Sequence, residues 1–159
     1  MAAWLGCAAR ELKLVDLPVQ IELSAAVHLA IPFHDCDPAG VAWHGNYFRY
    51  FDAARCALLD RIDYGYRRMV DSGFLWPIVQ ADVKYIRPLP YDTRVTVMAR
   101  LVEWDYRLKL AYEIVDATGS RMTTGHTVQV AVDAATGEMH VGAPAVLREQ
   151  MRRYLVSRA

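Results

Sequence analysis

A single long run without glycine or proline constrains the fold of this chain more than any other feature. Residues 46–62 contain neither residue type. The apolar side chains of the run recur every three or four positions, at Tyr47, Tyr50, Phe51, Ala54, Ala57 and Leu58. This spacing predicts one long α-helix with a wide apolar face. Because few of its side chains are charged, the helix needs a layer that covers most of its surface.

Segments that alternate apolar and other residues with a period of two surround this run and predict that layer. The side chains predicted to face the helix are Val27, Leu29, Ile31 and Phe33 before it, and Val79, Ala81, Val83, Tyr85, Val95, Val97, Ala99, Leu101, Leu108, Leu110, Tyr112, Ile114, Met122, Thr124, His126, Val128, Val130 and Val132 after it. Short polar turns between the later segments predict antiparallel hairpins. No helices separate these strands, which excludes a parallel α/β fold.

The sequence therefore predicts an α+β fold in which a curved antiparallel sheet wraps around one long central helix. We expect an N-terminal extension at residues 1–18 and one domain at residues 19–159. A short amphipathic helix should follow Pro144 near the end of the domain.

Composition and charge exclude several classes of function. Lys plus Arg and Asp plus Glu both number 18, so the chain lacks the basic excess that general nucleic-acid binding requires. We expect no membrane partner, because no apolar run reaches the roughly 20 residues that span a bilayer. We also expect no signal peptide. Three cysteines (Cys7, Cys36 and Cys56) show neither a disulfide framework nor zinc-site spacing, which favours a cytoplasmic location.

Residues able to do chemistry gather just before the long helix. The loop from His34 to Gly40 is dense in turn-forming residues and includes Asp37, and His44, Gly45 and Asn46 lead into the helix. Free N–H groups at a helix start stabilise an anion. A carboxylate beside such groups suits acyl transfer, because it can attack a carbonyl or deprotonate water while the amides receive the developing oxyanion.

Three other interpretations of this loop remain open at the level of sequence. The loop could be purely architectural, held by bonds between side chains and backbone. A metal site could use His34, Asp35, Asp37 and His44, although their spacing matches no known triad of ligands. Cys36 could act as a nucleophile with His44 as its base.

The segment at residues 34–41 (HDCDPAGV) is followed by residues 44–47 (HGNY) and by a helix that contains Tyr50, Phe51, Ala54 and Arg55. Together these residues closely resemble the active-site segment of the hotdog-fold acyl-CoA thioesterases. The subgroup is that of the 4-hydroxybenzoyl-CoA thioesterase. The resemblance continues through residues 83–92 (VKYIRPLPYD), which look like the family's strand and its proline-containing turn. It spans approximately residues 22–141.

The resemblance implies a role for each matching position. The family's catalytic aspartate falls on Asp37, and the residue whose backbone N–H binds the oxyanion falls on His44, which is the second predicted catalytic residue. Asn46 and Tyr47 match the family's pair at the helix start, and with Gly45 they are assigned to substrate binding. We interpret Asp35, the first acid of the motif, as structural.

The implied reaction is hydrolysis of an acyl-CoA, aromatic or fatty, to the free acid and CoA, with no cofactor and no metal. Candidate side chains for the acyl slot are Trp43, Tyr47, Tyr50, Phe74 and Trp76, and candidates for the CoA phosphates are Arg87, Arg94, Arg121, Arg148, Arg152 and Arg153. The family also implies a homo-oligomer, a dimer or a tetramer, with pockets at the subunit boundary.

Two other functions compete with hydrolysis. A hotdog dehydratase acting on carrier-protein thioesters would use a histidine as its base, and His44 is the nearest candidate. A non-catalytic module that binds acyl thioesters would not need Asp37.

Overall fold

The computed structural model describes residues 22–158, so the predicted extension at residues 1–18 lies outside the described residues. Its main elements are β1 (Ser24–Ala30), α1 (Tyr47–Asp60), α2 (Tyr66–Asp71), β2 (Phe74–Leu75), β3 (Ile78–Tyr85), β4 (Arg94–Glu103), β5 (Leu108–Asp116), β6 (Arg121–Gln129), β7 (Val132–Asp133) and α3 (Ala145–Val156). Two 3₁₀ turns, η1 (Phe33–Asp35) and η2 (His44–Asn46), lie between β1 and α1.

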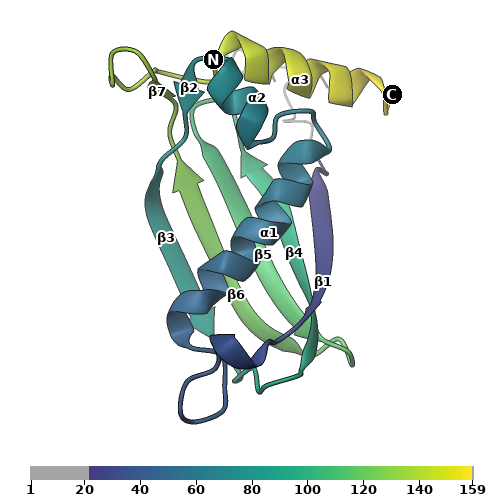
Figure 1. The fold of residues 1–159 in the computed structure, drawn as a ribbon. Helices are drawn as coiled ribbons and strands as arrows, with labels where there is room; N and C mark the ends of the chain where they lie inside the picture. Colours follow the sequence, from purple (N-terminus) through teal and green to yellow (C-terminus); the bar gives the residue numbers. More distant parts are fainter. Residues whose placement is uncertain (1–21, 159) are drawn as a thin grey trace, which may run out of the picture.

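A five-stranded antiparallel sheet with the order β1-β4-β5-β6-β3 covers one side of α1 (Figure 1). The strands β4, β5 and β6 form the predicted consecutive hairpins. The strand β3 does not pair with β4, which follows it in sequence, but lies at the far edge beside β6. The arrangement confirms the predicted α+β fold with a single long helix against a curved sheet.

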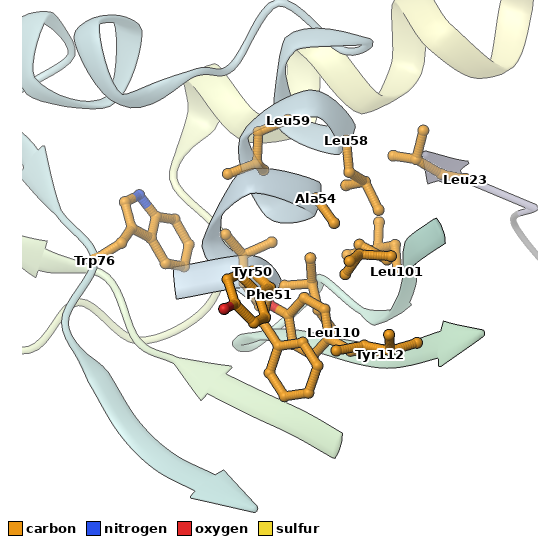
Figure 2. Close-up of a cluster of buried hydrophobic side chains, with 14 of the residues drawn as sticks. Leu23, Tyr50, Phe51, Ala54, Leu58, Leu59, Trp76, Leu101, Leu110 and Tyr112 are labelled. Atoms are coloured by element: carbon orange, nitrogen blue, oxygen red, sulfur yellow. The ribbon is translucent and has the colours of Figure 1, made fainter. Parts of the chain in front are cut away.

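The helix α1 begins one residue later and ends two residues earlier than predicted, and its apolar face forms the core (Figure 2). Phe51 is fully buried and stacks on Tyr112 of β5, with ring centroids 4.5 Å apart. Ala54 and Leu58 continue the same buried face and have no exposed surface. The helix is held to the sheet by these contacts, because aromatic and aliphatic burial is the largest stabilising term in such a layer.

The predicted faces of β4 and β5 are correct, but the predicted face of β6 is wrong. The side of β6 that meets α1 carries Thr123, Gly125, Thr127 and Gln129, which lie opposite core residues of β5. Thr127 shares a hydrogen bond of 2.9 Å with the buried Tyr112 hydroxyl. Thr127 and the Gln129 side-chain amide have partners within the core, whereas Thr123 Oγ1 and Gln129 Oε1 are buried and have none within residues 22–158.

Three further expectations about strands also fail. Phe33 is 77% exposed, because β1 ends at Ala30, before Pro32. Most of the side chains of β3 are exposed, since the strand lies at the edge of the sheet. The last predicted strand stops at Gln129, and β7 pairs with β2 in a separate two-stranded sheet.

Gly125 permits the close approach of α1 to the sheet, and its replacement by alanine is expected to destabilise the fold. A Cβ atom there would lie 2.6 Å from the backbone oxygen of Asp82 and 2.7 Å from the Phe51 ring. We expect the free energy of unfolding to fall by about 1–3 kcal/mol, as in other overpacked cores. Urea denaturation measures the change, with Thr124→Ala on the opposite face of β6 as the control. An unchanged denaturation midpoint for Gly125→Ala would refute this account of the contact.

The predicted C-terminal helix is confirmed as α3, which begins directly after Pro144. It buries Leu147 and Met151 and lies across the end of the molecule where α1 terminates (Figure 1). The short helix α2 was not predicted. Among residues 22–158, no helix is both long enough and apolar enough to cross a membrane.

Candidate active site

The loop between β1 and α1 holds Asp37 in a tight turn. The Asp37 N–H donates to the Val41 carbonyl at 2.9 Å, and the Gly40 N–H donates to the Asp37 carbonyl at 2.9 Å. The carboxylate oxygen Oδ1 of Asp37 accepts the Ala39 N–H at 2.8 Å. Such a bond between an aspartate and the backbone two residues on fixes the side-chain rotamer. The half-buried carboxylate is therefore held through one oxygen, and the second oxygen has no acceptor role in this turn.

Asp35 anchors the same loop to the first turns of α1. Its carboxylate is only 3% exposed and accepts bonds from Arg49 Nη1 at 2.7 Å and from the Tyr50 hydroxyl at 2.9 Å. The backbone oxygen of Asp35 accepts the Trp43 N–H at 2.8 Å and the Asn46 side-chain amide at 2.9 Å. Burial and the bond to Asp35 raise the pKa of the Tyr50 phenol above its usual range. These contacts confirm the structural interpretation of Asp35.

The turn η2 presents free backbone N–H groups at the start of α1. Within residues 22–158, the N–H groups of His44 and Gly45 donate to no protein acceptor, as expected for the first residues of a helix. The Tyr85 hydroxyl of β3 donates to the His44 carbonyl at 2.8 Å and so ties the turn to the sheet edge. The Trp43 ring lies against Gly45, where any Cβ atom would collide with it. This turn is built to accept negative charge.

Asp37 and His44, the first residue of η2, line one pocket of about 340 Å³. Its lining residues are Asp37, Val41, Ala42, His44, Tyr47, Tyr85, Ile86, Arg87 and Pro88. Burial raises the pKa of the Tyr47 phenol, and the charge of Asp37 acts in the same direction. Four of the residues predicted for the site therefore meet here: Asp37, His44, Tyr47 and Arg87.

The structure places other predicted site residues away from this pocket. The Trp76 indole donates to the Tyr64 hydroxyl at 3.1 Å in the core beside the second half of α1 (Figure 2). The Asn46 amide is directed to Asp35, and the half-exposed Trp43 covers Gly45. Several arginines predicted to bind phosphate form ion pairs instead: Arg121 with Glu113, and Arg152 and Arg153 with Glu149.

The two alternative chemistries of the loop find little support in its geometry. The Cys36 thiol donates to the Pro32 carbonyl at 3.6 Å rather than to a histidine. The carboxylate of Asp35, a possible metal ligand, is occupied by Arg49 and Tyr50. In the described part of the chain, no three His, Cys, Asp or Glu side chains are grouped to hold a metal ion.

Tyr85 and Ile86 line the pocket, although the sequence predicts for them only a place in a strand or just after one. Tyr85 packs edge-on against Tyr47, with ring centroids 4.8 Å apart, so both aromatic rings border the space beside Asp37. Their place in the pocket could have been predicted, since both residues directly precede Arg87 and Pro88 in the segment that resembles the family's turn.

Comparisons with known proteins agree on one family. A model of the thioesterase-like superfamily matches residues 31–154. The 4-hydroxybenzoyl-CoA thioesterase of a Pseudomonas species is 30% identical over 118 residues, which are 70% of this chain and 78% of that protein.

Solved structures show the same fold. A DHNA-CoA thioesterase from Staphylococcus aureus superposes with a TM-score of 0.73 at 22% identity. The superposition covers 84% of this chain and 89% of the thioesterase chain. Another Staphylococcus aureus protein, solved in complex with CoA, has a TM-score of 0.74 at 14% identity and covers 87% of each chain. This chain therefore belongs to the thioesterase-like superfamily and is a hotdog-fold thioesterase-superfamily hydrolase.

Proposed function

We propose that this protein hydrolyses an acyl-CoA thioester, aromatic or fatty, to the free acid and CoA in the pocket between Asp37 and the turn η2. One observation carries the proposal: Asp37, whose carboxylate is fixed by its turn, and His44, whose N–H donates to no acceptor within residues 22–158, line the same 340 Å³ pocket. Both parts are needed for acyl transfer, because charge develops on the carbonyl oxygen as a nucleophile attacks its carbon. The names of the relatives support the CoA thioester as substrate.

In the proposed mechanism, the thioester oxygen points at the N–H groups of His44 and Gly45, which stabilise the tetrahedral oxyanion. The Asp37 carboxylate either attacks the carbonyl carbon or removes a proton from an attacking water. In the first route, CoA thiolate leaves, and water then hydrolyses a mixed anhydride on Asp37. In the second route, the acid forms directly as the thiolate leaves. The exposed imidazole of His44 lies at the pocket and can orient the water or the thiolate.

We also propose that two copies of the chain associate through the edge strand β3. Apolar side chains along and after this strand are exposed, including Val79 (58%), Tyr85 (44%) and Ile86 (42%). An unpaired edge of this kind gains hydrogen bonds and burial by pairing with a second strand. Since Tyr85 and Ile86 also line the Asp37 pocket, pairing there would close the pocket at the boundary between subunits.

Release of free thiol from a panel of aromatic and fatty acyl-CoAs tests the proposed reaction. We expect hydrolysis of at least one member. Absence of thiol release from every member would favour a module that binds acyl thioesters without cleaving them. Conversion of a 3-hydroxyacyl thioester to its enoyl product, without thiol release, would identify a dehydratase instead.

Replacing Tyr85 with phenylalanine should lower the rate of hydrolysis without unfolding the protein. The lost hydroxyl holds the His44 carbonyl at 2.8 Å, and without it the oxyanion turn is less well positioned. We expect kcat to fall by about 10-fold, a typical effect of small misplacement at a site. Steady-state kinetics measure this, with Tyr91→Phe, at an exposed tyrosine outside the pocket, as the control. Equal kcat values for wild type and Tyr85→Phe would remove this role from the hydroxyl.

A further inference from the structure

Asn46 stands directly before α1, at the position where an asparagine usually caps a helix. A capping side chain accepts an N–H group of the first helical turn, and the capping residue then has an extended backbone. Asn46 has helical angles instead (φ −73°, ψ −17°), because η2 continues into α1, and its side chain caps no N–H group. Its Nδ2 atom donates to the backbone oxygen of Asp35 at 2.9 Å. The Asn46 side chain therefore holds the loop before the helix rather than the helix itself.

Three hydrogen bonds form a closed ring around His44 and Gly45. The Trp43 N–H donates to the Asp35 oxygen at 2.8 Å, and the Asn46 N–H donates to the Trp43 oxygen at 2.9 Å. The Asn46 side chain completes the ring by donating to the same Asp35 oxygen. Within residues 22–158, the N–H groups of His44 and Gly45 donate to no protein acceptor. The ring thus fixes both ends of the turn that carries these two free N–H groups.

The Asp35 residue that closes this ring is itself held firmly. Its side chain is only 3% exposed and accepts bonds from Arg49 Nη1 at 2.7 Å and from the Tyr50 hydroxyl at 2.9 Å. Both donors lie in the first turn of α1. Without the Asn46 side chain, the Asp35 oxygen would keep its bond from the Trp43 N–H. The loop should then stay folded, while the end of η2 gains freedom of movement.

We propose that Asn46 is a positioning residue for thioester hydrolysis, which keeps the free N–H groups of His44 and Gly45 in place for the oxyanion. The inference rests on the proposed function, and it differs from the substrate-binding role that the sequence predicts for Asn46. Asn46 is not among the residues that line the pocket with Asp37, and its amide is already bonded to Asp35. A displaced N–H group costs most in the transition state, because the negative charge on the carbonyl oxygen develops only as the nucleophile attacks. Loss of the Asn46 amide should therefore lower kcat and leave KM almost unchanged.

Two substitutions of Asn46 and one control test this role. Asn46→Ala removes the donor, and it should not weaken the helix, because alanine favours a helix more than asparagine does. Asn46→Gln keeps an amide donor on a longer side chain and is the conservative variant. Ser157→Ala is the matched control, because the Ser157 hydroxyl also donates to a backbone oxygen, that of Tyr154 at 2.8 Å. Ser157 follows α3, at the end of the molecule opposite the start of α1 (Figure 1).

Steady-state kinetics on the best substrate of the acyl-CoA panel and urea denaturation give the first two measurements. We expect kcat of Asn46→Ala to fall by about 10- to 100-fold, the range for a small misplacement at a site. Its KM should stay within about twofold of the wild-type value. Asn46→Gln should recover part of kcat, and Ser157→Ala should match wild type. The urea midpoint should be nearly the same in all four proteins.

The order parameters of the His44 and Gly45 amides, from ¹⁵N relaxation of the free protein, report on the ring without any reaction. In wild type they should be about 0.85, which is typical of a rigid backbone. In Asn46→Ala they should fall toward about 0.6, the value of a flexible segment.

The inference is wrong if Asn46→Ala keeps the wild-type kcat, or if its order parameters do not change. A higher KM with an unchanged kcat would make Asn46 a substrate-binding residue, and a loss of kcat that only parallels a lower urea midpoint would make it a folding residue. If Asn46→Ala does not fold, Asn46→Leu, which has the shape of asparagine without its donor, takes its place. Absence of thiol release from every acyl-CoA would overturn the proposed reaction, whereas the order parameters would still show whether Asn46 holds the turn.

Discussion

Replacing Asp37 with asparagine is expected to lower kcat for thioester hydrolysis by about 10²- to 10⁴-fold, the contribution typical of a positioned general base. Asparagine retains the oxygen that accepts the Ala39 N–H, so the turn and the pocket should keep their shape. The side chain loses its negative charge and with it the ability to attack a carbonyl or to deprotonate water. The loss should therefore appear in kcat, with the dissociation constant for substrate little changed.

Steady-state kinetics on the best substrate of the acyl-CoA panel measure this effect. Asp92→Asn is a suitable control, because Asp92 is exposed and has a positive φ of 62°, which asparagine tolerates. Its kcat should equal that of wild type. Full hydrolysis by Asp37→Asn would remove Asp37 from the mechanism, even if the enzyme proved to be a thioesterase.

Replacing Phe51 with alanine is expected to lower the free energy of unfolding by about 3–5 kcal/mol, as for other large aromatic residues removed from a core. Phe51 has no exposed surface and stacks on Tyr112, and the small residue Gly125 leaves nothing to fill the resulting cavity. For a domain that is stable by only about 5–15 kcal/mol, this loss is a large fraction of the total.

Urea denaturation followed by tryptophan fluorescence gives the measurement. Phe33→Ala is the matched control, since the same substitution at a side chain that is 77% exposed should change the free energy of unfolding by less than about 0.5 kcal/mol. Similar decreases in the free energy of unfolding at the two positions would mean that the contact between Phe51 and Tyr112 does not stabilise the fold.

Periodicity in the sequence was sufficient to predict the long helix, the hairpins of β4, β5 and β6, and the fold class. It failed on β6 because hydropathy records which side chains are apolar and not which polar ones find partners. Gln129 faces the core and donates to the Trp76 carbonyl at 2.6 Å, a contact between residues 53 positions apart. Val128, on the opposite face, is also buried, so the strand carries no clear polar side.

The candidate site was predicted only in part. Residues inside the loop motif, such as Asp37 and His44, lie close to one another along the chain and meet in the pocket. Trp76 was grouped with them for its residue type alone, but it lies in the core beside Tyr64. Arg55 belongs to the helix segment that resembles the family, but its burial was not predicted, because a charge on a helix is ordinarily solvated and only the packing shows otherwise. The roles of Asp37 and His44 in catalysis stay predictions.

The bond from the Tyr85 hydroxyl to His44 links two parts of the molecule that are otherwise distinct. The same strand provides the unpaired margin of the sheet and the restraint on the amides that would receive the oxyanion. Under the proposed pairing through β3, a second copy on that edge would also restrain the turn, and the catalytic rate would then depend on the dimer rather than on the single chain.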